Sequence, residues 1–390
     1  MAQGGMCQAR SVVGKSDRFL QTLDHQRDVI VVHWLRRLDA GQMGRVIDGE
    51  WTEDDGDLFR NDGFVRLASR YNDEIPDEVV EAMTGEPRRY FLVASLSCPW
   101  SHRALVMHRI KSLEAAVPVK VASGRRNEGY PVDENRAWRL PGTGRDVTYV
   151  HEVYTASDEG YTGSASVPLL WDSANRRVVS NDSLQIMKAF DRVDSCLSDD
   201  NVTLYPEDLR HEIDELNDQI FLGLANGVYR AGLARSQRHY DDAVADVFET
   251  LDLLETRLAR GRLLFGRRLT LSDLVLFPVL ARFDVVYHTH FRCTRRRLAD
   301  YPMLWDYARD LIGWGPFATD VDFDAIRSGY FLHDGDHNPH GIISERPDCD
   351  WSAPHARDAF GAPLVSLRAG GVAEFKPPAA RANDNQAGSR

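Results

Sequence analysis

The sequence predicts an α/β domain followed by an all-helical domain. Between residues 90 and 193, short apolar runs that are typical of buried strands alternate with helical stretches. From about residue 209 to residue 326, apolar side chains recur at spacings of three or four, as they do on amphipathic helices. The chain has 390 residues, which is enough for two domains of ordinary size.

The first domain is predicted to contain four strands and two helices. The predicted elements are, in order, the strand 90–94, the helix 104–113, the strands 117–121, 167–171 and 177–179, and a helix that begins near Asp182 or Ser183 and ends near residue 193. The order β-α-β followed by β-β-α is the layout of the thioredoxin fold. Residues 123–164 are polar and rich in glycine, so we interpret them as a long insertion.

The second domain is predicted from three segments with apolar stripes. These segments are residues 209–229, 241–259 and 269–283. Thr270 stands three residues before Asp273, which is a variant of the capping box at a helix start. Pro278 lies inside the third segment and is expected to kink or interrupt that helix.

The regions outside the two domains have little periodicity. Residues before Met43 read poorly as a domain, and Met43 opens a segment that resembles a protein start, so we interpret them as an extension or a start-site artefact. The next stretch is rich in Asp, Glu and Gly, which predicts an irregular arm, and the last stretch is predicted to be disordered. The predicted regions are an extension (1–43), an irregular arm (44–88), the α/β domain (89–200), the helical domain (201–330), a C-terminal extension (331–369) and a disordered tail (370–390).

Composition and charge exclude several functions. The chain has 47 basic and 59 acidic residues, a formal net charge of −12, which argues against a nucleic acid as its main partner. No stretch approaches the roughly 20 apolar residues of a membrane span. Five scattered cysteines, an odd number, make a disulfide framework improbable and predict a reducing cytoplasm.

A single cysteine carries the strongest chemical signal. Cys98 lies between a predicted strand and a predicted helix, where free amides and the helix dipole favour a thiolate. Pro99 suits the first helical position, where no amide donor is needed. Ser101 stands where a second, resolving cysteine would lie, so a mixed disulfide with an external thiol is the expected product. The alternative reading is that Cys98 is a small buried apolar residue.

Two further features suit a thiol site that binds glutathione. Pro168 precedes an apolar strand, where thioredoxin-like folds place a cis-proline, and the backbone of Val167 could then pair with the cysteinyl part of a bound thiol. Asp182 and Ser183 lie at a helix start. Ser183 could cap that helix, and Asp182 could bind the ammonium of a γ-glutamyl group. The alternatives are a plain strand-entry proline and a simple helix cap.

Several long motifs, in fixed order, resemble one family. They are SLSCPWSHRALVMHRIKSLE, SVPLLWD, VVSNDSLQIMKAFD, EIDELNDQIF, NGVYRAGLARSQ, LTLSDLVLFPVLARFDVVYHTHFRC and HNPHGIIS. Over about residues 44–361 the chain resembles the glutathionyl-hydroquinone reductases, also called Xi-class glutathione transferases. The resemblance implies a thioredoxin-like N-terminal domain that binds glutathione, an all-α glutathione-transferase-like C-terminal domain, and a homodimer.

The resemblance also assigns site residues. Cys98 matches the catalytic thiol, Val167 the backbone contact to glutathione, and Asp182 and Ser183 the Glu-Ser pair at the γ-glutamyl end. Arg103 belongs to the active-site motif without an assigned contact. Three tyrosines match those that line the hydroquinone pocket, namely Tyr229, Tyr287 and Tyr330.

This chain departs from the family pattern at two positions. Tyr130 stands where the family usually has a tryptophan against glutathione, and Trp138 is a possible substitute for that missing ring. Asp182 replaces a glutamate and is shorter by one methylene. Both changes bear on the affinity for glutathione more than on the reaction.

The resemblance implies a two-step reaction. The Cys98 thiolate attacks the sulfur of a glutathionyl-hydroquinone, and a second glutathione then releases oxidised glutathione. A pocket tyrosine, for which Tyr229 and Tyr330 are the candidates in the catalytic set, supplies the proton. The alternatives are a conjugating transferase that uses Ser101 and a glutathione-binding protein without turnover. No metal is expected, and we interpret the cluster His333, Asp334, Asp336, His337 and His340 as incidental.

Overall fold

The computed structural model describes residues 44–53, 58–194, 201–333 and 338–378. The prediction of an N-terminal extension over residues 1–43 lies outside these residues, as does the last part of the predicted tail, 379–390. Among the residues described, no helix is long and apolar enough to cross a membrane.

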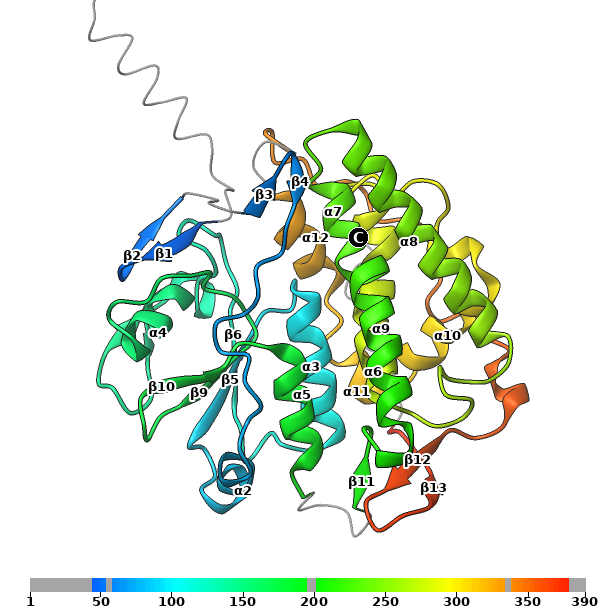
Figure 1. Cartoon of the computed structure of the whole chain (residues 1–390), viewed down its shortest axis with the longest axis horizontal. Helices are drawn as coiled ribbons and strands as arrows, with labels where there is room; N and C mark the ends of the chain where they lie inside the picture. Colours follow the sequence, from blue (N-terminus) through cyan, green and yellow to red (C-terminus); the bar gives the residue numbers. More distant parts are fainter. Residues whose placement is uncertain (1–43, 54–57, 195–200, 334–337, 379–390) are drawn as a thin grey trace, which may run out of the picture. The chain divides into compact units, whose positions relative to one another are not determined.

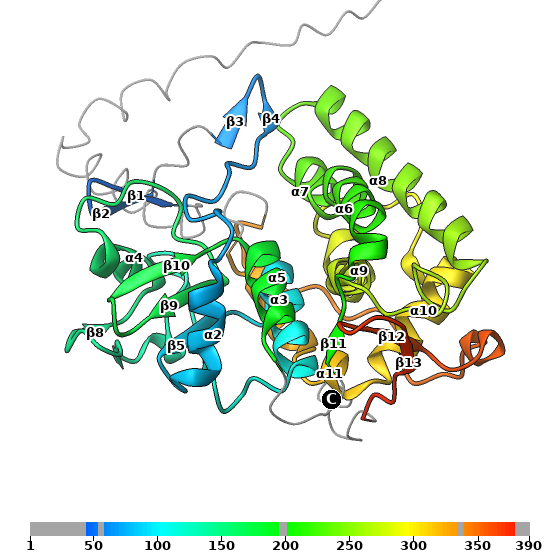
Figure 2. The same ribbon diagram turned by 60° about the horizontal axis from the view of Figure 1, so that its bottom comes forward.

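The α/β domain is built on a four-stranded sheet in the order β10-β9-β5-β6. The central strand β5 (Tyr90–Ala94) pairs parallel with β6 (Val119–Val121) and antiparallel with β9 (Leu169–Asp172), which pairs antiparallel with β10 (Arg177–Ser180). Helices α3 (Pro99–Ile110) and α5 (Ser183–Arg192) lie between this sheet and the helical domain, and α4 (Val150–Ser157) lies on the other side (Figures 1 and 2). The predicted thioredoxin-like layout is confirmed.

The predicted insertion contains more structure than its sequence indicated. Within it, β7 (Trp138–Arg139) and β8 (Asp146–Val147) form a hairpin that leads into α4. Buried side chains of this region, including Val132, Leu140, Val147 and Val153, pack with β9 in a small hydrophobic core. These apolar residues are too widely spaced to show a period, which is why the sequence predicted only a loop.

The arm was predicted to be irregular, and this prediction was wrong for much of its length. It contains the hairpins β1 (Arg45–Ile47) with β2 (Glu50–Thr52) and β3 (Phe59–Arg60) with β4 (Gly63–Phe64), followed by helix α2 (Asp77–Gly85). Val79, Val80 and Met83 are buried on one face of α2. Short hairpins and a nine-residue helix gain their stability from the domain they pack on, so their sequences carry only weak local signals.

The helical domain confirms the predicted stripes. Its helices are α6 (Arg210–Gln219), α7 (Gly227–Gly232), α8 (Gln237–Leu258), α9 (Leu271–Arg282), α10 (Pro302–Ile312), α11 (Gly315–Ala318) and α12 (Phe323–Phe331), and π-helical turns cover Ile220–Ala225 and Phe283–Tyr287. The capping box of Thr270 and Asp273 is present at the start of α9. Pro278 does not interrupt α9, because every residue of this helix is buried and the surrounding core holds it.

The C-terminal extension returns to the junction between the two domains. β12 (Leu364–Leu367) pairs with β11 (Val202–Thr203), which follows the α/β domain, and with β13 (Val372–Glu374). The prediction that the tail is disordered from residue 370 was therefore wrong as far as residue 378. β13 is short and exposed, and its pairing with β12 rather than its own pattern defines it.

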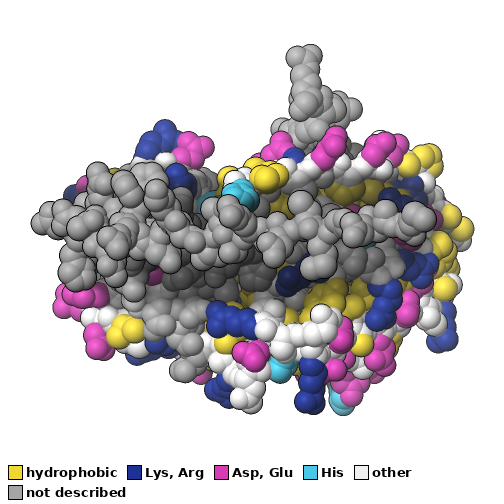
Figure 3. Space-filling view, turned by 90° about the horizontal axis from the view of Figure 1, so that it is seen from above, with side chains coloured by type: hydrophobic (Ala, Val, Ile, Leu, Met, Phe, Trp, Pro, Cys, Tyr) yellow, Lys and Arg dark blue, Asp and Glu magenta, His cyan; other side chains and the backbone are white. Residues whose placement is uncertain are grey.

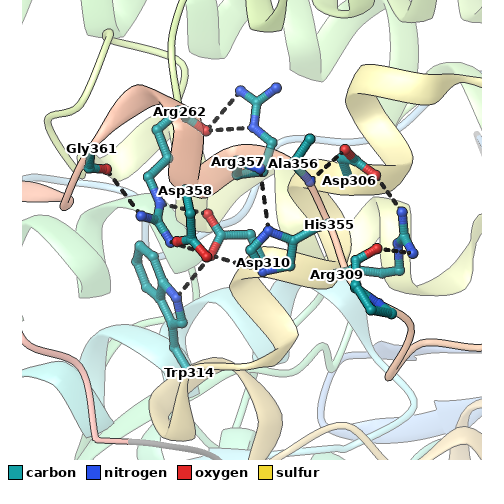
Figure 4. Close-up of polar contacts among 11 residues, drawn as sticks. Arg262, Asp306, Arg309, Asp310, Trp314, His355, Ala356, Arg357, Asp358 and Gly361 are labelled. Carbon is teal, nitrogen blue, oxygen red and sulfur yellow. Dashed lines mark hydrogen bonds and ion pairs between the residues drawn. The ribbon is translucent and has the colours of Figure 1, made fainter.

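Polar contacts attach this extension to α10 (Figure 4). The buried carboxylate of Asp310 accepts two hydrogen bonds from Arg262, at 2.8 and 2.7 Å, and one from the Trp314 indole at 3.3 Å. Arg262 also pairs with Asp358 at 2.9 Å, and the buried guanidinium of Arg357 donates to the carbonyl of Arg262. On the face seen in Figure 3, acidic and basic side chains of the described residues are interspersed.

Candidate active site

The site is centred on Cys98, at the start of α3. Cys98 is the N-cap residue, Pro99 occupies the first turn, and the thiol is buried. Its Sγ lies 3.4 Å from the carbonyl oxygen of Val167 and donates a hydrogen bond to it. The Val167–Pro168 peptide bond is cis, as predicted. The fold therefore brings together two residues that are 69 positions apart in the sequence.

Ser101 does not face this site. It lies on the first turn of α3 with no exposed surface, and its Oγ accepts a hydrogen bond from the backbone N–H of Ser95 at 3.1 Å. This hydroxyl is buried, and the loop before Cys98 donates to its oxygen. The geometry therefore gives no support to the alternative in which Ser101 activates glutathione.

A buried arginine holds the loop that precedes Cys98. The guanidinium of Arg282, at the end of α9, donates to the carbonyl oxygens of Leu96 at 2.8 Å and Ser97 at 3.0 Å. It also lies 3.1 Å from Nδ1 of His102, whose pKa is held well below its usual value by burial and by the Arg282 charge. A neutral His102 accepts this hydrogen bond. Sequence reasoning missed Arg282, although it is the one charged residue in the apolar run LVLFPVLARF, which is a usable signal.

The helix start at Asp182 and Ser183 is arranged differently from the prediction. Asp182, not Ser183, caps α5: its Oδ1 accepts hydrogen bonds from the amides of Leu184 at 2.8 Å and Gln185 at 3.0 Å. Ser183 instead accepts two hydrogen bonds from Arg103, from Nε at 2.9 Å and from Nη2 at 2.7 Å. A carboxylate reaches two amides at a helix start more readily than a hydroxyl on the first helical residue does.

This arrangement supplies the contact of Arg103 that the sequence left open. Burial lowers the pKa of Arg103 to about 10, while Asp182 and Cys98 act in the opposite direction. The guanidinium also lies over the ring of Trp100, 4.8 Å from its centre. Arg103 therefore joins the helix that carries the thiol to the helix that carries the predicted γ-glutamyl site.

Three tyrosine hydroxyls form a cluster in the helical domain. The hydroxyl of Tyr330 lies 2.6 Å from that of Tyr229 and 3.1 Å from that of Tyr287. Burial raises the pKa of Tyr229 and of Tyr330 well above the usual value, and that of Tyr287 to about 12. Electrostatic interaction with Cys98 is a smaller further cause of the raised pKa of Tyr229 and Tyr287. All three predicted pocket tyrosines are thus brought together and stay protonated at neutral pH.

Tyr130 lies in the first part of the insertion. The guanidinium of Arg126 stacks on its ring at 3.9 Å from the centre, and Nη2 of Arg126 donates to Ser97 at 2.9 Å. Trp138 packs edge-on against Phe91 of β5, with ring centres 6.3 Å apart, so its contacts do not support the hypothesis that it replaces the missing tryptophan.

The indole of Trp51 lies next to Gly129, the residue before Tyr130. A Cβ on Gly129 would lie 2.9 Å from this ring. The arm thus supplies an aromatic side chain next to the position at which the family pattern changes.

Two more residues complete the surroundings. Gly329 lets α12 approach the thiol loop, because a Cβ at this position would lie 2.2 Å from Cβ of Ser97. Arg66, from the arm, lies over the rings of Tyr229 and Trp100 at 4.7 and 5.0 Å. Sequence reasoning missed both, since neither has a local motif that indicates a role.

Among the described residues, no group of three His, Cys, Asp or Glu side chains is placed to hold a metal ion. Asp334, Asp336 and His337 of the histidine-rich cluster lie outside the residues that the structure describes.

Two family descriptions match the chain. "Glutathione S-transferase, N-terminal domain" matches residues 97–193, and "Glutathione S-transferase, C-terminal domain" matches residues 237–310. The chain is 40% identical over 332 residues to "Glutathionyl-hydroquinone reductase YqjG" of Escherichia coli (strain K12), covering 82% of this chain and 100% of that protein. It is 37% identical over 314 residues to "Glutathionyl-hydroquinone reductase PcpF" of Sphingobium chlorophenolicum, covering 78% of this chain and 96% of that protein.

Solved structures agree with these matches. The Xi-class glutathione transferase of Natrialba magadii is similar with a TM-score of 0.75 and 37% identity, covering 82% of this chain and 98% of that one. The glutathione-bound structure of Escherichia coli K-12 YqjG is similar with a TM-score of 0.66 and 40% identity, covering 70% of this chain and 89% of that one. With its thioredoxin-like sheet, its helical domain and a cysteine at the start of α3, the chain belongs to the glutathionyl-hydroquinone reductases, the Xi class of glutathione transferases.

Proposed function

We propose that the protein reduces glutathionyl-hydroquinones to hydroquinones, with glutathione as the reductant and Cys98 as the nucleophile. The observation that carries this proposal is the position of the Cys98 thiol, at a helix N-terminus and 3.4 Å from the Val167 carbonyl. Free amides and the helix dipole at such a position favour a thiolate, and a thiolate is the nucleophile in thiol exchange.

In the first step, the Cys98 thiolate attacks the sulfur of the bound thioether. A disulfide forms between Cys98 and glutathione, the carbon–sulfur bond breaks, and its electron pair passes to the ring carbon, which takes up a proton. In the second step, the thiolate of another glutathione attacks the mixed disulfide. Oxidised glutathione leaves and the Cys98 thiolate is regenerated, so that two glutathionyl groups are oxidised while the aromatic carbon is reduced.

Glutathione is proposed to bind along the α/β domain. The backbone of Val167 would pair with its cysteinyl part, and Asp182 and Ser183 would bind the γ-glutamyl end. Oδ1 of Asp182 is engaged in capping, which leaves Oδ2 for an ammonium. Arg103 fixes the Ser183 hydroxyl through two hydrogen bonds, and Tyr130 would offer its aromatic face to the peptide.

The hydroquinone is proposed to bind against the cluster of Tyr229, Tyr287 and Tyr330. Because burial keeps these hydroxyls protonated, one of them can serve as the acid that supplies the ring proton. We assign this role to the Tyr229–Tyr330 pair, whose hydroxyls lie 2.6 Å apart.

Three properties of the chain stay predictions. They are a homodimer, a cytoplasmic location, and the absence of nucleic-acid partners. Light scattering of the purified protein tests the first of them.

The decisive experiment follows hydroquinone release from a glutathionyl-hydroquinone with excess glutathione, for the wild type and for Cys98→Ala. Cys349→Ala is a matched control, because this half-buried thiol contacts Asp284 outside the site. We expect turnover by the wild type and the control and none by Cys98→Ala. Mass spectrometry of the wild type quenched with limiting glutathione should detect one glutathione on Cys98. A wild type that binds glutathione without turnover would instead indicate a binding protein.

A further inference from the structure

Arg66 comes from the arm that precedes both domains, yet it lies against two aromatic rings beside the thiol and the tyrosine cluster. Its guanidinium carbon is 4.7 Å from the ring centre of Tyr229 and 5.0 Å from that of Trp100. Trp100 follows Cys98 by two residues on α3, and the Tyr229 hydroxyl belongs to the tyrosine cluster. The arm therefore places a cation at the edge of the pocket proposed to hold the hydroquinone.

The charge of Arg66 has no acidic partner within the described ranges 44–53, 58–194, 201–333 and 338–378. Its Nε donates to Oδ1 of Asn226 at 2.8 Å, and its two terminal nitrogens make no hydrogen bond to any residue in those ranges. A guanidinium has five N–H donors, four of them on the terminal nitrogens. Arg70, four residues along the same arm, instead pairs with Asp158 at 3.4 Å and donates to the Thr162 carbonyl at 2.9 Å.

The positive charge of Arg66 acts on the Tyr229 hydroxyl. Burial raises the pKa of Tyr229, and Arg66 acts against this rise. The other cation on Trp100 is Arg103, whose Nε and Nη2 are engaged by Ser183. Within the described ranges, both terminal nitrogens of Arg66 are therefore without a hydrogen bond, whereas one terminal nitrogen of Arg103 is engaged. The half-buried position of Arg66 shields it in part from solvent.

We propose that Arg66 is a specificity determinant, and that it favours hydroquinones that carry an anionic ring substituent such as a carboxylate. A planar carboxylate matches the fork of a guanidinium and can accept two parallel hydrogen bonds from it. A neutral ring in the same place would gain only the weaker cation–π attraction. This proposal rests on the proposed function, because it concerns the aromatic part of the same substrates.

The test compares two substrates that differ by one ring carboxylate. They are the glutathionyl thioethers of hydroquinone and of 2,5-dihydroxybenzoate, and the measured quantity is the ratio of their kcat/KM values. Arg66→Gln should lower the charged-to-neutral ratio by about tenfold or more, since a charge-assisted hydrogen bond is lost. Arg66→Lys should restore part of the ratio. Arg70→Gln removes the same charge from the same arm and should leave the ratio unchanged.

Both substrates carry the same glutathione carboxylates. A change in the ratio of their kcat/KM values therefore reports on the ring carboxylate and not on glutathione. An equal loss for both substrates in Arg66→Gln would mean that Arg66 braces the arm or binds glutathione, and would overturn the proposal. Thermal melting of the Gln variants at positions 66 and 70 detects a general loss of folding.

A binding measurement tests the role of Arg66 without requiring turnover, and therefore independently of the proposed function. In the Cys98→Ala background with glutathione present, calorimetry compares 2,5-dihydroxybenzoate with hydroquinone. A preference for the carboxylate that disappears with Arg66→Gln supports the proposal even if the wild type shows no turnover. The absence of any preference overturns it.

Discussion

The hydroxyl oxygens of Tyr229 and Tyr330 lie 2.6 Å apart, and Tyr330 also contacts Tyr287 at 3.1 Å. The Tyr330 hydroxyl thus lies within hydrogen-bond distance of both other hydroxyls. Because α7, the π-helical turn after α9, and α12 each contribute one hydroxyl, the cluster depends on the packing of the whole helical domain.

Tyr330→Phe should lower kcat more than it changes KM. The substitution keeps the ring but removes the hydroxyl shared by both hydrogen bonds, and loss of a positioned acid typically costs about 10²-fold or more in rate. Steady-state kinetics at saturating glutathione measures the effect. Tyr205→Phe, which removes a hydroxyl bound to Asp214 and Lys188 elsewhere, is the matched control. A Tyr330→Phe enzyme with wild-type kcat would exclude Tyr330 from proton transfer.

Gly329→Ala should reduce both activity and stability. The added Cβ would lie 2.2 Å from Cβ of Ser97, which cannot move without shifting the backbone one residue before Cys98. Overpacking of this kind costs about 1–3 kcal/mol, and we expect kcat/KM to fall by about tenfold or more. Gly85→Ala at the end of α2 meets nothing within 4 Å and is the control. If Gly329→Ala and Gly85→Ala had the same kcat/KM and the same free energy of unfolding, the close approach of α12 to the thiol loop would be contradicted.

Arg103 and Ser183 should act as a unit in glutathione binding. Arg103→Lys cannot reproduce the two hydrogen bonds from Nε and Nη2, so the KM for glutathione should rise by about tenfold. Ser183→Ala should have an effect of similar size, and the double variant should be little worse than either single one. Glutathione titrations of all three variants check this, and fully additive effects would indicate independent roles.

The pH dependence of stability should carry a contribution from Asp273. Burial raises the pKa of this carboxyl to about 6, against about 3.9 in an unfolded chain. Between these two pKa values the folded state binds more protons than the unfolded state. The contribution of Asp273 to the free energy of unfolding is therefore full below pH ~4 and is lost as the pH rises through ~6. The loss is at most about 3 kcal/mol. In urea unfolding, the free energy of unfolding of the wild type should fall relative to that of Asp273→Asn as the pH rises from ~4 to ~6. A constant difference between the two proteins would contradict the raised pKa.

Asp310→Asn should destabilise the protein strongly. Its carboxylate binds the buried Arg262 through two hydrogen bonds, and removal of one partner from a buried ion pair costs about 3–5 kcal/mol. Asp242→Asn, in the exposed pair with Arg238 at 3.9 Å, should change the free energy of unfolding by about 1 kcal/mol or less. Chemical denaturation of both variants decides whether the network of Figure 4 anchors the extension.

The sequence predicted those parts of the site that lie in local motifs. Cys98 was predicted because a cysteine and a proline between a strand and a helix form a recognisable start of α3. The capping role moved from Ser183 to Asp182, because two polar residues at one helix start can exchange roles without a change of pattern. Arg282, Gly329 and Arg66 were missed, since each acts on residues far away in the sequence, and only the packed fold brings them together.

The pairing of β12 with β11 has a mechanical consequence. β11 lies where the chain leaves the α/β domain, so β12, from the last described part of the chain, is hydrogen-bonded to the connection between the two domains. Moving the domains apart would first require peeling away these strands, which resists hinge bending at that connection. After a single proteolytic cut between α12 and β12, this restraint would depend on noncovalent contacts alone, while every residue of the thiol site and the tyrosine cluster would stay in place.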